Sequence, residues 1–494
     1  MRIKREHRTL NVEHRTPNSG LRFGSFDVRR SLFGVRCSRL QRASVLIIVL
    51  WVAIGLVSIA LYFANSMTYE LRASDNRVNG LAADQAIEGA ARYVGYVLYY
   101  YATNGAVPAT NQFACEAVPV GDAHFWLIGR DPSVPNPDEP AFGLVDEGSK
   151  LNLNTVNTNV LSYLPNMTVD FAQAIMDWRG TNGVVSLDYA ALGYLPKNAP
   201  FETVDELRLV YGATVDLLAG DDLNRNGVLD AHETDSTGLG QLNSGLFEYT
   251  TVWTREPNFH SDGTMLTNVN TLLIGKRNGD QLATFLQNEG VGSATTVASR
   301  LWSDIAMGNG SGTPSPCRSV LDFAVRCQRY GMSEADFEKM YNDVTCKDPT
   351  NSANLYFRGR LNVNTASADV LTALFMGLNV DEMTASGAAQ TLVTYREQNP
   401  GNLTTIWWLI DALGNNHPVI TALAARDLVT TKSFQFTADI AAVGPFGRGY
   451  RRVKFIFDIS NGSPVILYRQ DLSRLGWALG EKARQTLLAN NTTQ

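Results

Sequence analysis

An uncharged apolar run near the N-terminus constrains the fold of this chain more than any other feature. Val45–Ala64 contains 20 residues without a charged side chain, interrupted only mildly by Ser58 and Tyr62. About 20 helical residues cross the hydrocarbon core of a bilayer. A secretory signal peptide has a shorter apolar region, of about 7 to 15 residues, which ends at a cleavage site of small residues. The run therefore predicts a membrane-spanning helix.

The residues before this run are strongly basic. Residues 1–43 contain 11 Lys and Arg against 3 Asp and Glu, which leaves 31 basic and 45 acidic residues in the rest of the chain. Because Lys and Arg are enriched on the cytoplasmic side of a span, we expect the N-terminus inside and the body outside. The acidic body also argues against a nucleic-acid surface spread over the fold.

The helix is predicted to continue past the span to about Ala102. Apolar residues recur there at spacings of three, four and seven positions, which is typical of an amphipathic helix. They are Leu71, Val78, Leu81, Ala82, Ile87, Ala90, Val94, Val97, Leu98 and Tyr101. We therefore expect one long helix whose outer half packs its apolar stripe on a domain.

The start of the span, "QRASVLIIVLWVAIGL", resembles the type III signal of type IV pilins and type II secretion pseudopilins. That resemblance implies that a prepilin peptidase in the membrane cuts after Ala43, where the family usually has Gly, and methylates Ser44. Most pilins carry Glu at the fifth mature position, a charge that the membrane tolerates when a neighbouring subunit's amine pairs with it. This chain has Ile48 there. Lack of that Glu is characteristic of the GspK family, type II secretion system protein K.

The body contains a repeated motif. The segments "KLNLNTVNTNVLSYL" from Lys150 and "RLNVNTASADVLTAL" from Arg360 share a basic residue, Leu, Asn, an apolar residue, Asn and Thr, and "TNVNTLLIGK" from Thr267 is a weaker third copy. Asn and Thr side chains cap helix N-termini. We therefore expect the motif to cap the following helices, through Asn154 or Thr155 and through Asn364 or Thr365.

Each strong copy continues into helices that resemble helix-hairpin-helix domains. Such domains often bind the DNA backbone through a turn of Gly, an apolar residue and Gly, whereas the two turns here are "LPNMT" and "GLNVD". We interpret the units as packing modules and protein-interaction surfaces, and we expect no nucleic-acid partner.

One segment matches a calcium-binding loop at every constrained position. "DLNRNGVLDAHE" fits the pattern D-x-[DN]-x-[DN]-G-x5-E. The pattern assigns as ligands the side chains of Asp222, Asn224, Asn226, Asp230 and Glu233 and the carbonyl of Val228. All-oxygen ligation favours Ca²⁺, and a single loop favours a structural site. K-type pseudopilins are similar in carrying calcium. The alternative is an Asx-rich surface loop without a metal.

Four of the five cysteines follow the span. They are Cys115, Cys317, Cys327 and Cys346. In an oxidising compartment, four thiols can form two disulfides in three ways. Two helices joined near Gly331 are predicted between Cys317 and Cys346, which would bring these two residues together at the open end of a hairpin. We expect a disulfide between them, and buried free cysteines are the alternative.

The C-terminal part of the chain has the pattern of an antiparallel meander. "SFQFTADIAAV" and "RVKFIFDIS" alternate apolar and polar residues, and a third strand, Val465–Arg469, follows the turn "NGSP". Arg448, Arg451 and Arg452 lie beside the first turn and are expected to be solvated. Earlier strands near "AHFWLIGRD" and "AFGLVDEG" are expected in the same sheet, against the long helix.

These elements predict an α+β fold of the pilin type, with a long N-terminal helix and an antiparallel sheet. A large, mostly α-helical insertion with helix-hairpin-helix-like units interrupts it. The predicted parts are a cytoplasmic leader at 1–43, the transmembrane part at 44–66, the first part of the pseudopilin domain at 67–148, the insertion at 149–430 and the second part at 431–494.

The segments "DEGSKLNLNT", "TVWTREPN" and "VGPFGRGYRRVKF" also resemble landmarks of the GspK family in their order. The resemblance implies a minor pseudopilin that initiates or caps the type II secretion pseudopilus, with its helix in the bacterial inner membrane and its body in the periplasm. Its implied partners are I-type and J-type minor pseudopilins, the major pseudopilin and the prepilin peptidase. A type IV pilus minor pilin and a membrane-anchored DNA-uptake receptor are the alternatives. The histidines after the span are scattered, so no enzymatic activity is expected.

Overall fold

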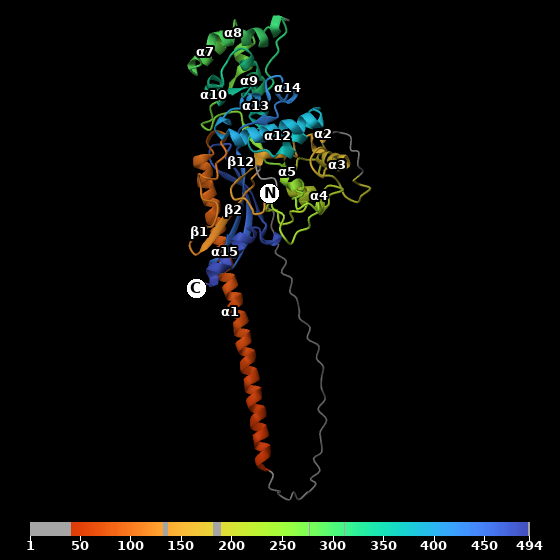
Figure 1. The fold of residues 1–494 in the computed structure, drawn as a ribbon, viewed down its shortest axis with the longest axis vertical. Coiled ribbons are helices and arrows are strands. Elements are labelled where there is room, and N and C mark those ends of the chain that lie inside the picture. The colour runs from red at the N-terminus through yellow and green to blue at the C-terminus, as the bar shows by residue number, and fades with distance from the viewer. Residues whose placement is uncertain (1–40, 132–136, 181–188, 276, 311, 493–494) are drawn as a thin grey trace, which may run out of the picture. The chain divides into compact units, whose positions relative to one another are not determined.

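The computed structural model describes residues 41–131, 137–180, 189–275, 277–310 and 312–492. The chain divides into two compact parts, with the boundary between Leu71 and Arg72. Helix α1 (Gln41–Tyr101) has 61 residues and contributes to both parts (Figure 1). Its end at Tyr101 agrees with the predicted end near Ala102, so the long helix is confirmed.

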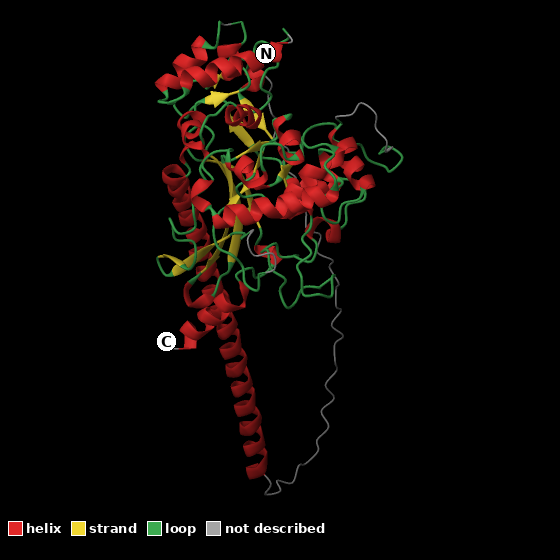
Figure 2. Ribbon diagram, turned by 45° about the horizontal axis from the view of Figure 1, so that its top comes forward, coloured by secondary structure: helices red, strands yellow, loops and turns green. Residues whose placement is uncertain are grey.

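The second compact part is built on an antiparallel sheet formed by strands from both ends of the chain (Figure 2). The strand order is β1 (Val118–Val120), β2 (Ala123–Ile128), β12 (Gln435–Val443), β13 (Arg451–Asp458) and β14 (Val465–Asp471), and β3 (Val145–Asp146) also pairs with β12. The predicted α+β fold, with its N-terminal helix, antiparallel sheet and interrupting insertion, is therefore confirmed.

One face of the sheet shares a core with the outer half of α1. The helix contributes small residues and a few larger ones, including Ala83, Ala86, Ile87, Ala90, Val94 and Leu98. The sheet contributes Phe125, Leu127, Phe436, Ala438, Ile440, Phe455 and Phe457. Alternate residues of a strand lie on the same face of a sheet. The apolar residues of the alternating pattern therefore lie on the face that shares this core with α1. Each large side chain buried here contributes about 1.5–3 kcal/mol.

The opposite face of β12 is polar and is also buried. Gln435, Thr437 and Asp439 are 2%, 4% and 7% exposed. Their partners are Asp458 for Gln435, Glu147 for Thr437 and Arg452 for Asp439. The insertion covers this face. The polar residues of the alternating pattern therefore lie opposite α1, but they are buried and not exposed to solvent.

The chain between β3 and β12 forms the insertion, which is mostly helical. Its helices are α2 (Thr158–Leu161), α3 (Val169–Arg179), α4 (Val215–Ala219), α5 (Leu246–Tyr249), α6 (Val269–Leu273), α7 (Asp280–Asn288), α8 (Ala294–Ile305), α9 (Val320–Arg329), α10 (Glu334–Tyr341), α11 (Ala368–Gly377), α12 (Glu382–Gln398), α13 (Trp408–Leu413) and α14 (Pro418–Ala424). A further helix, α15 (Gly480–Thr492), follows the sheet.

All three copies of the repeated motif adopt one arrangement. Each begins with a two-residue strand that pairs in parallel with a strand at the end of the same unit. The pairs are β4 (Leu151–Asn152) with β5 (Thr250–Thr251), β7 (Thr267–Asn268) with β8 (Val344–Thr345), and β10 (Leu361–Asn362) with β11 (Val429–Thr430). They define a first unit (151–251), a middle unit (267–345) and a last unit (361–430). Antiparallel strands β6 (Arg255–Pro257) and β9 (Tyr356–Arg358) pair on either side of the middle unit.

The motif asparagines hold each unit together, and in the first and last units they do not cap the next helix, whereas Asn268 of the middle unit caps α6. The first Asn of each copy accepts the N–H two residues further on, at 2.8–3.0 Å. The second Asn bonds to a later backbone segment, Asn154 at Phe201, Asn270 at Cys317 and Asn364 at Leu403. The caps of α2 and α11 are Asn157 and Ser367. The predicted caps at 154–155 and 364–365 are therefore wrong, because a turn separates the motif from the helix.

Asp146, at the end of β3, connects the sheet to the last unit. This carboxylate is 4% exposed. It accepts hydrogen bonds from the Gly148 N–H at 2.6 Å, from Asn362 Nδ2 at 2.8 Å and from the Thr365 hydroxyl. Burial raises the pKa of Asp146 although these donors act against the rise.

Glu147 connects the sheet to the first unit. Its carboxylate, 2% exposed, accepts from the hydroxyls of Thr437 in β12 and Thr251 in β5. Burial acts to raise the pKa of Glu147, but Lys150 and Lys454 outweigh it and lower the pKa below its ordinary value. The sheet and the two outer units thus meet at two adjacent residues.

A close contact between α2 and α11 can be tested at Gly377. A Cβ at this position would lie 2.7 Å from Cα of Val160, a backbone atom that cannot rotate away. We expect Gly377→Ala to lower the free energy of unfolding by about 1–3 kcal/mol in denaturant titrations. Gly387→Ala in α12 is the control: nothing lies within 4 Å of the added methyl group, and we expect about 0.5–1 kcal/mol of stabilisation. Equal effects of the two substitutions would contradict the contact.

Candidate functional site

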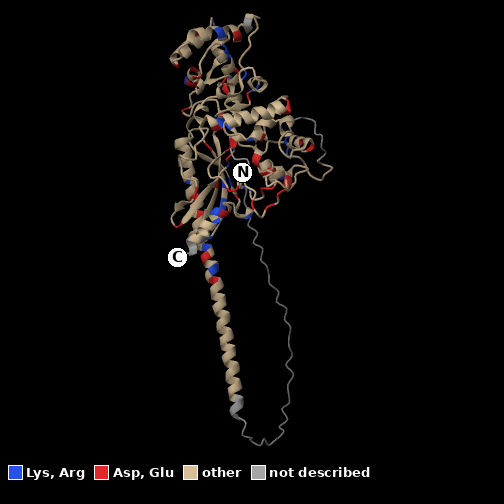
Figure 3. Cartoon of the chain, in the orientation of Figure 1, with Lys and Arg blue, Asp and Glu red and all other residues tan. Residues whose placement is uncertain are grey.

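The first half of α1 has the exposed apolar surface predicted for a membrane span. Its large apolar side chains are more than half exposed, for example Ile48 at 59% and Trp51 at 73%. Figure 3 shows a long uncharged stretch of this helix, which corresponds to residues 45–69. Among the described residues, α1 is long and apolar enough to cross a membrane.

The predicted processing site lies in the first turn of α1. The helix begins at Gln41, so Ala43 and Ser44 are both helical. The leader up to residue 40 lies outside the described residues. A cut between Ala43 and Ser44 would place Ile48 in the second turn of the mature helix.

The predicted calcium loop lies between α4 and α5, and its polar side chains turn inward. Asp222, Asn224 and Asn226 are 6%, 1% and 1% exposed. The Asn226 and Gly227 N–H groups donate to Asp222 at 2.9 and 2.7 Å, and the Val228 N–H donates to Asn226 at 2.9 Å. The backbone is therefore wound around the side chains that the motif assigns as ligands.

The remaining predicted ligands face these side chains. Asp230 Oδ2 accepts from the amides of Asn224 and Asn226 at 2.5 and 3.0 Å. Glu233 accepts the N–H groups of Asn224 and Asp230, both at 3.1 Å. Half a turn of either amide about its side-chain bond would bring its oxygen to the place now held by its nitrogen. Asn224, Asn226 and Asp230 are thus joined by their side chains, whereas Asp222 and Glu233 accept backbone N–H groups of the same loop. The oxygen atoms of these five residues are of the kind that a hard cation prefers.

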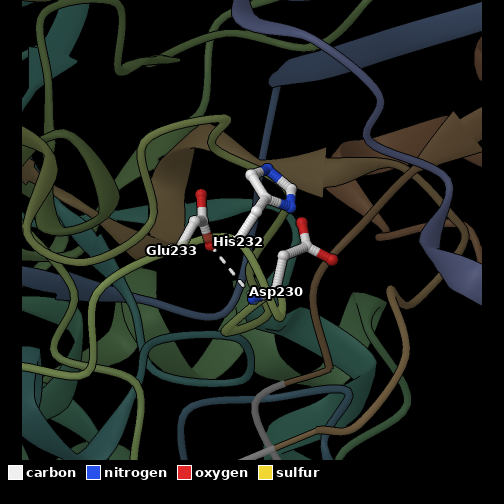
Figure 4. A group of neighbouring side chains, drawn as sticks. All are labelled: Asp230, His232 and Glu233. Atoms are coloured by element: carbon white, nitrogen blue, oxygen red, sulfur yellow. Dashed lines mark hydrogen bonds between the residues drawn. The ribbon is translucent and has the colours of Figure 1, made fainter.

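His232 lies at the exposed rim of this loop. One ligand atom from each of Asp230, His232 and Glu233 lies within 4.8 Å of the others (Figure 4). The motif gives His232 no ligand position, and hard cations such as Ca²⁺ prefer oxygen. This imidazole is therefore a neighbour of the candidate centre and not one of its predicted ligands.

Arg452 in β13 attaches the loop to the sheet. It is fully buried, pairs with Asp439 at 2.6 Å, and donates to the carbonyls of Asn224 and Arg225. The expectation that Arg452 is a solvated hairpin charge is therefore wrong. The insertion covers this part of β13 and supplies carbonyl oxygens to the guanidinium group.

Arg130, which follows β2, attaches the loop from a second strand. It donates to the carbonyls of Arg225 at 3.2 Å and Asn226 at 3.3 Å, and pairs with Glu248 at 2.9 Å. No sequence pattern distinguishes Arg130 or Glu248 from other surface charges, so the sequence analysis misses both. Their roles depend on the fold that brings distant segments together.

Asp222 is the most strongly perturbed carboxylate of the loop. Burial raises its pKa to about 6, although Arg130 acts in the opposite direction. A bound divalent cation would favour the ionised form and remove this cost. The electrostatics of the loop are therefore those of a site that gains stability from a cation.

The predicted hairpin before Cys346 is present. α9 and α10 are joined at Gly331, whose φ is 90°. Cys317 precedes α9, Cys346 follows β8, and both are free cysteines whose backbone carbonyls accept hydrogen bonds from Asn270 Nδ2. The disulfide itself stays a prediction.

The turns of the helix-hairpin-helix-like units are occupied by side-chain caps. Thr168 accepts the Phe171 N–H at the start of α3, and Asp381 accepts the Thr384 N–H at the start of α12. A phosphate would need these N–H groups, and the Asp381 carboxylate would repel it. The geometry does not favour DNA binding by these turns.

Comparisons with known proteins give a distant likeness among solved structures. No family model and no curated protein matches the chain. Among solved structures, a match is found to the crystal structure of the GspK-GspI-GspJ complex from the enterotoxigenic Escherichia coli type 2 secretion system, with 12% sequence identity and a TM-score of 0.15. The match covers 44% of this chain and 78% of that chain. At this identity and TM-score, the match supports no conclusion about the fold or the role of this chain.

Replacing Arg452 tests the attachment of the loop. Arg452→Met keeps a long side chain but leaves Asp439 buried without its cation, so we expect a loss of about 3–5 kcal/mol in unfolding free energy. Arg451→Met is the matched control, because Arg451 pairs with Asp84 on the surface, where side-chain exposures are 39% and 51%. Its loss is expected to stay below about 1 kcal/mol. Similar losses in both variants would refute the special role of Arg452.

Proposed function

We propose that this chain is a minor pseudopilin of a type II secretion system, which sits at the tip of the pseudopilus and initiates or caps its assembly. The observation that carries the proposal is helix α1. Its residues 43–69 carry no charge and its large apolar side chains from Val45 to Tyr69 are exposed, whereas its second half packs on an antiparallel sheet. One such helix can serve as a membrane span before assembly and as part of a filament core afterwards.

Ile48 supports a position at the tip. A charged residue in a membrane helix is costly unless a partner compensates it. A subunit inside a filament can obtain that partner from the amine of its neighbour, whereas the first subunit has no earlier neighbour. An apolar residue at this position removes the need for one.

The size of the insertion supports the same position. The chain leaves the sheet after β3 and returns at Gln435, and the intervening segment contains thirteen helices within the described residues. Such a body would obstruct the stacking of further subunits above it. At the tip it meets no such restriction.

The proposal includes an orientation and partners. The basic leader places the N-terminus in the cytoplasm, so the body lies in the periplasm. The prepilin peptidase would cut after Ala43 and methylate Ser44. I-type and J-type minor pseudopilins and the major pseudopilin would then assemble with α1. A minor pilin of a type IV pilus is the second reading of the same helix.

A structural Ca²⁺ in the loop is part of the proposal. Asp222, Asn224, Asn226, Asp230 and Glu233 would hold it with the Val228 carbonyl. The ion would compensate buried negative charge and stiffen the segment to which Arg130 and Arg452 donate. It would therefore strengthen the attachment of the insertion to the sheet.

The mature N-terminus and the co-purifying subunits test the proposed function together. Mass analysis of the protein from its native membrane should give a methylated Ser44, and affinity purification should recover I-type and J-type pseudopilins. Recovery of type IV pilus subunits instead would favour the second reading. An intact leader would show that α1 is a plain anchor and would exclude both.

Calcium removal tests the metal site separately. At a free Ca²⁺ concentration 100 times the Kd, binding adds about 2.7 kcal/mol to the stability. We expect chelation to lower the melting temperature, and Glu233→Gln to abolish the difference between calcium and chelator. His232→Ala, beside the same loop, should keep that difference. A melting temperature independent of calcium in the unmodified protein would exclude the site.

A further inference from the structure

Three of the cysteines gather in and beside the middle unit. Cys317 precedes α9, Cys327 lies within α9, and Cys346 follows β8. Cys317 and Cys327 are 3% and 0% exposed, and Cys317 influences the pKa of both other thiols. Cys115 is elsewhere: it belongs to the core between α1 and the sheet, where its thiol contacts the Phe142 carbonyl.

One side chain fixes the backbones of Cys317 and Cys346 next to each other. Asn270 Nδ2 donates to the carbonyl of Cys317 at 3.0 Å and to the carbonyl of Cys346 at 2.9 Å, while its Oδ1 accepts the Cys317 N–H at 2.8 Å. Two oxygens bonded to the same nitrogen lie at most about 6 Å apart. The two backbones are therefore held side by side, which is the arrangement that a disulfide between neighbouring segments requires.

The electrostatics of the thiols agree with this arrangement. The Cys317 side chain is the largest cause that raises the pKa of the Cys346 thiol, followed by burial. For Cys327, burial is the largest cause that raises the thiol pKa, and Cys317 comes second. Among the hydrogen bonds of the described residues, Asn270 joins the backbones of residues 317 and 346 and does not join either of them to Cys327.

The middle unit lacks a connection that the other two units have. In the first unit, Arg179 donates to the carbonyls of Leu153 and Val156. In the last unit, Arg396 donates to the equivalent carbonyls of Val363 and Ala366. In the described part of the middle unit, no arginine makes the corresponding pair of contacts. A link between the segment before α9 and the segment after β8 would add a connection of a different kind to this unit.

We propose that Cys317 and Cys346 form a disulfide that closes the middle unit, and that Cys327 stays a buried free thiol beside it. Both thiols lose a proton and an electron each as the S–S bond forms, and a disulfide donor in the compartment is reduced to two thiols. The cross-link joins residues 29 positions apart, and closing a loop of this size restricts the unfolded chain. The proposal rests on the proposed function in one respect: the periplasmic location of the body supplies the oxidising compartment.

Peptide mapping of the purified full chain tests the pairing. After alkylation under denaturing, non-reducing conditions, we expect one linked pair of peptides containing Cys317 and Cys346, with Cys327 and Cys115 alkylated. The chain could instead be isolated with reduced thiols and form this link only after treatment with oxidised glutathione. That result would support the pairing of the two cysteines and contradict the periplasmic location. Alkylation of both Cys317 and Cys346 after that treatment, or a link to Cys327, would overturn the proposal.

The effect of a reductant on the melting temperature tests what the bond does. Reduction should lower the melting temperature of the unmodified protein by about 3 °C. Cys317→Ser and Cys346→Ser should each remove this dependence, whereas Cys327→Ser should keep it. Each variant is compared with and without reductant. A general loss of stability caused by the substitution therefore does not change the conclusion. A dependence that survives Cys317→Ser, or one lost in Cys327→Ser, would contradict the assignment.

Discussion

Two neighbouring carboxylates, Asp146 and Glu147, are the interaction on which the arrangement of the body depends. An ionised carboxylate taken out of water costs several kcal/mol unless donors replace its hydration. Here the donors come from the sheet and from two different units, so the donors of each carboxylate lie on more than one element. Separating the insertion from the sheet would remove the donors Asn362 and Thr365 from Asp146 and the donor Thr251 from Glu147. This explains why the sheet and the insertion belong to one compact part.

The same constraint explains the burial of both faces of β12. Its apolar face is buried by the small and branched side chains of α1, and this burial requires no hydrogen-bond partners. Its polar face can be covered only where every group finds a partner, as Thr437 does with Glu147 and Asp439 does with Arg452. Arg452 in turn reaches the carbonyls of the candidate calcium loop. The loop, the sheet and the first unit are therefore linked through a chain of charged contacts.

Local patterns in the sequence predict much of this structure, and long-range contacts set the rest. Helical spacing predicts α1 to within one residue of its end, and alternation predicts β12 to β14. The two strong copies of the motif predict two similar units, and the structure shows that the weaker copy begins a third. The motif gives the wrong role to Asn154 and Asn364, because an Asn before a helix looks like a cap whether or not a turn intervenes. Arg130 and Arg452 have no local signal, since their partners lie about a hundred or more positions away.

Each unit ends beside the strand with which it begins, and this has a topological consequence. Parallel pairs β4 with β5, β7 with β8, and β10 with β11 bring the entry and exit of the chain together. The chain therefore leaves such a unit close to the point where it entered, as it would with a short loop. Whole units can therefore be gained or lost without displacing β3 from β12. The insertion can grow by such modules while the strands beneath it keep their register.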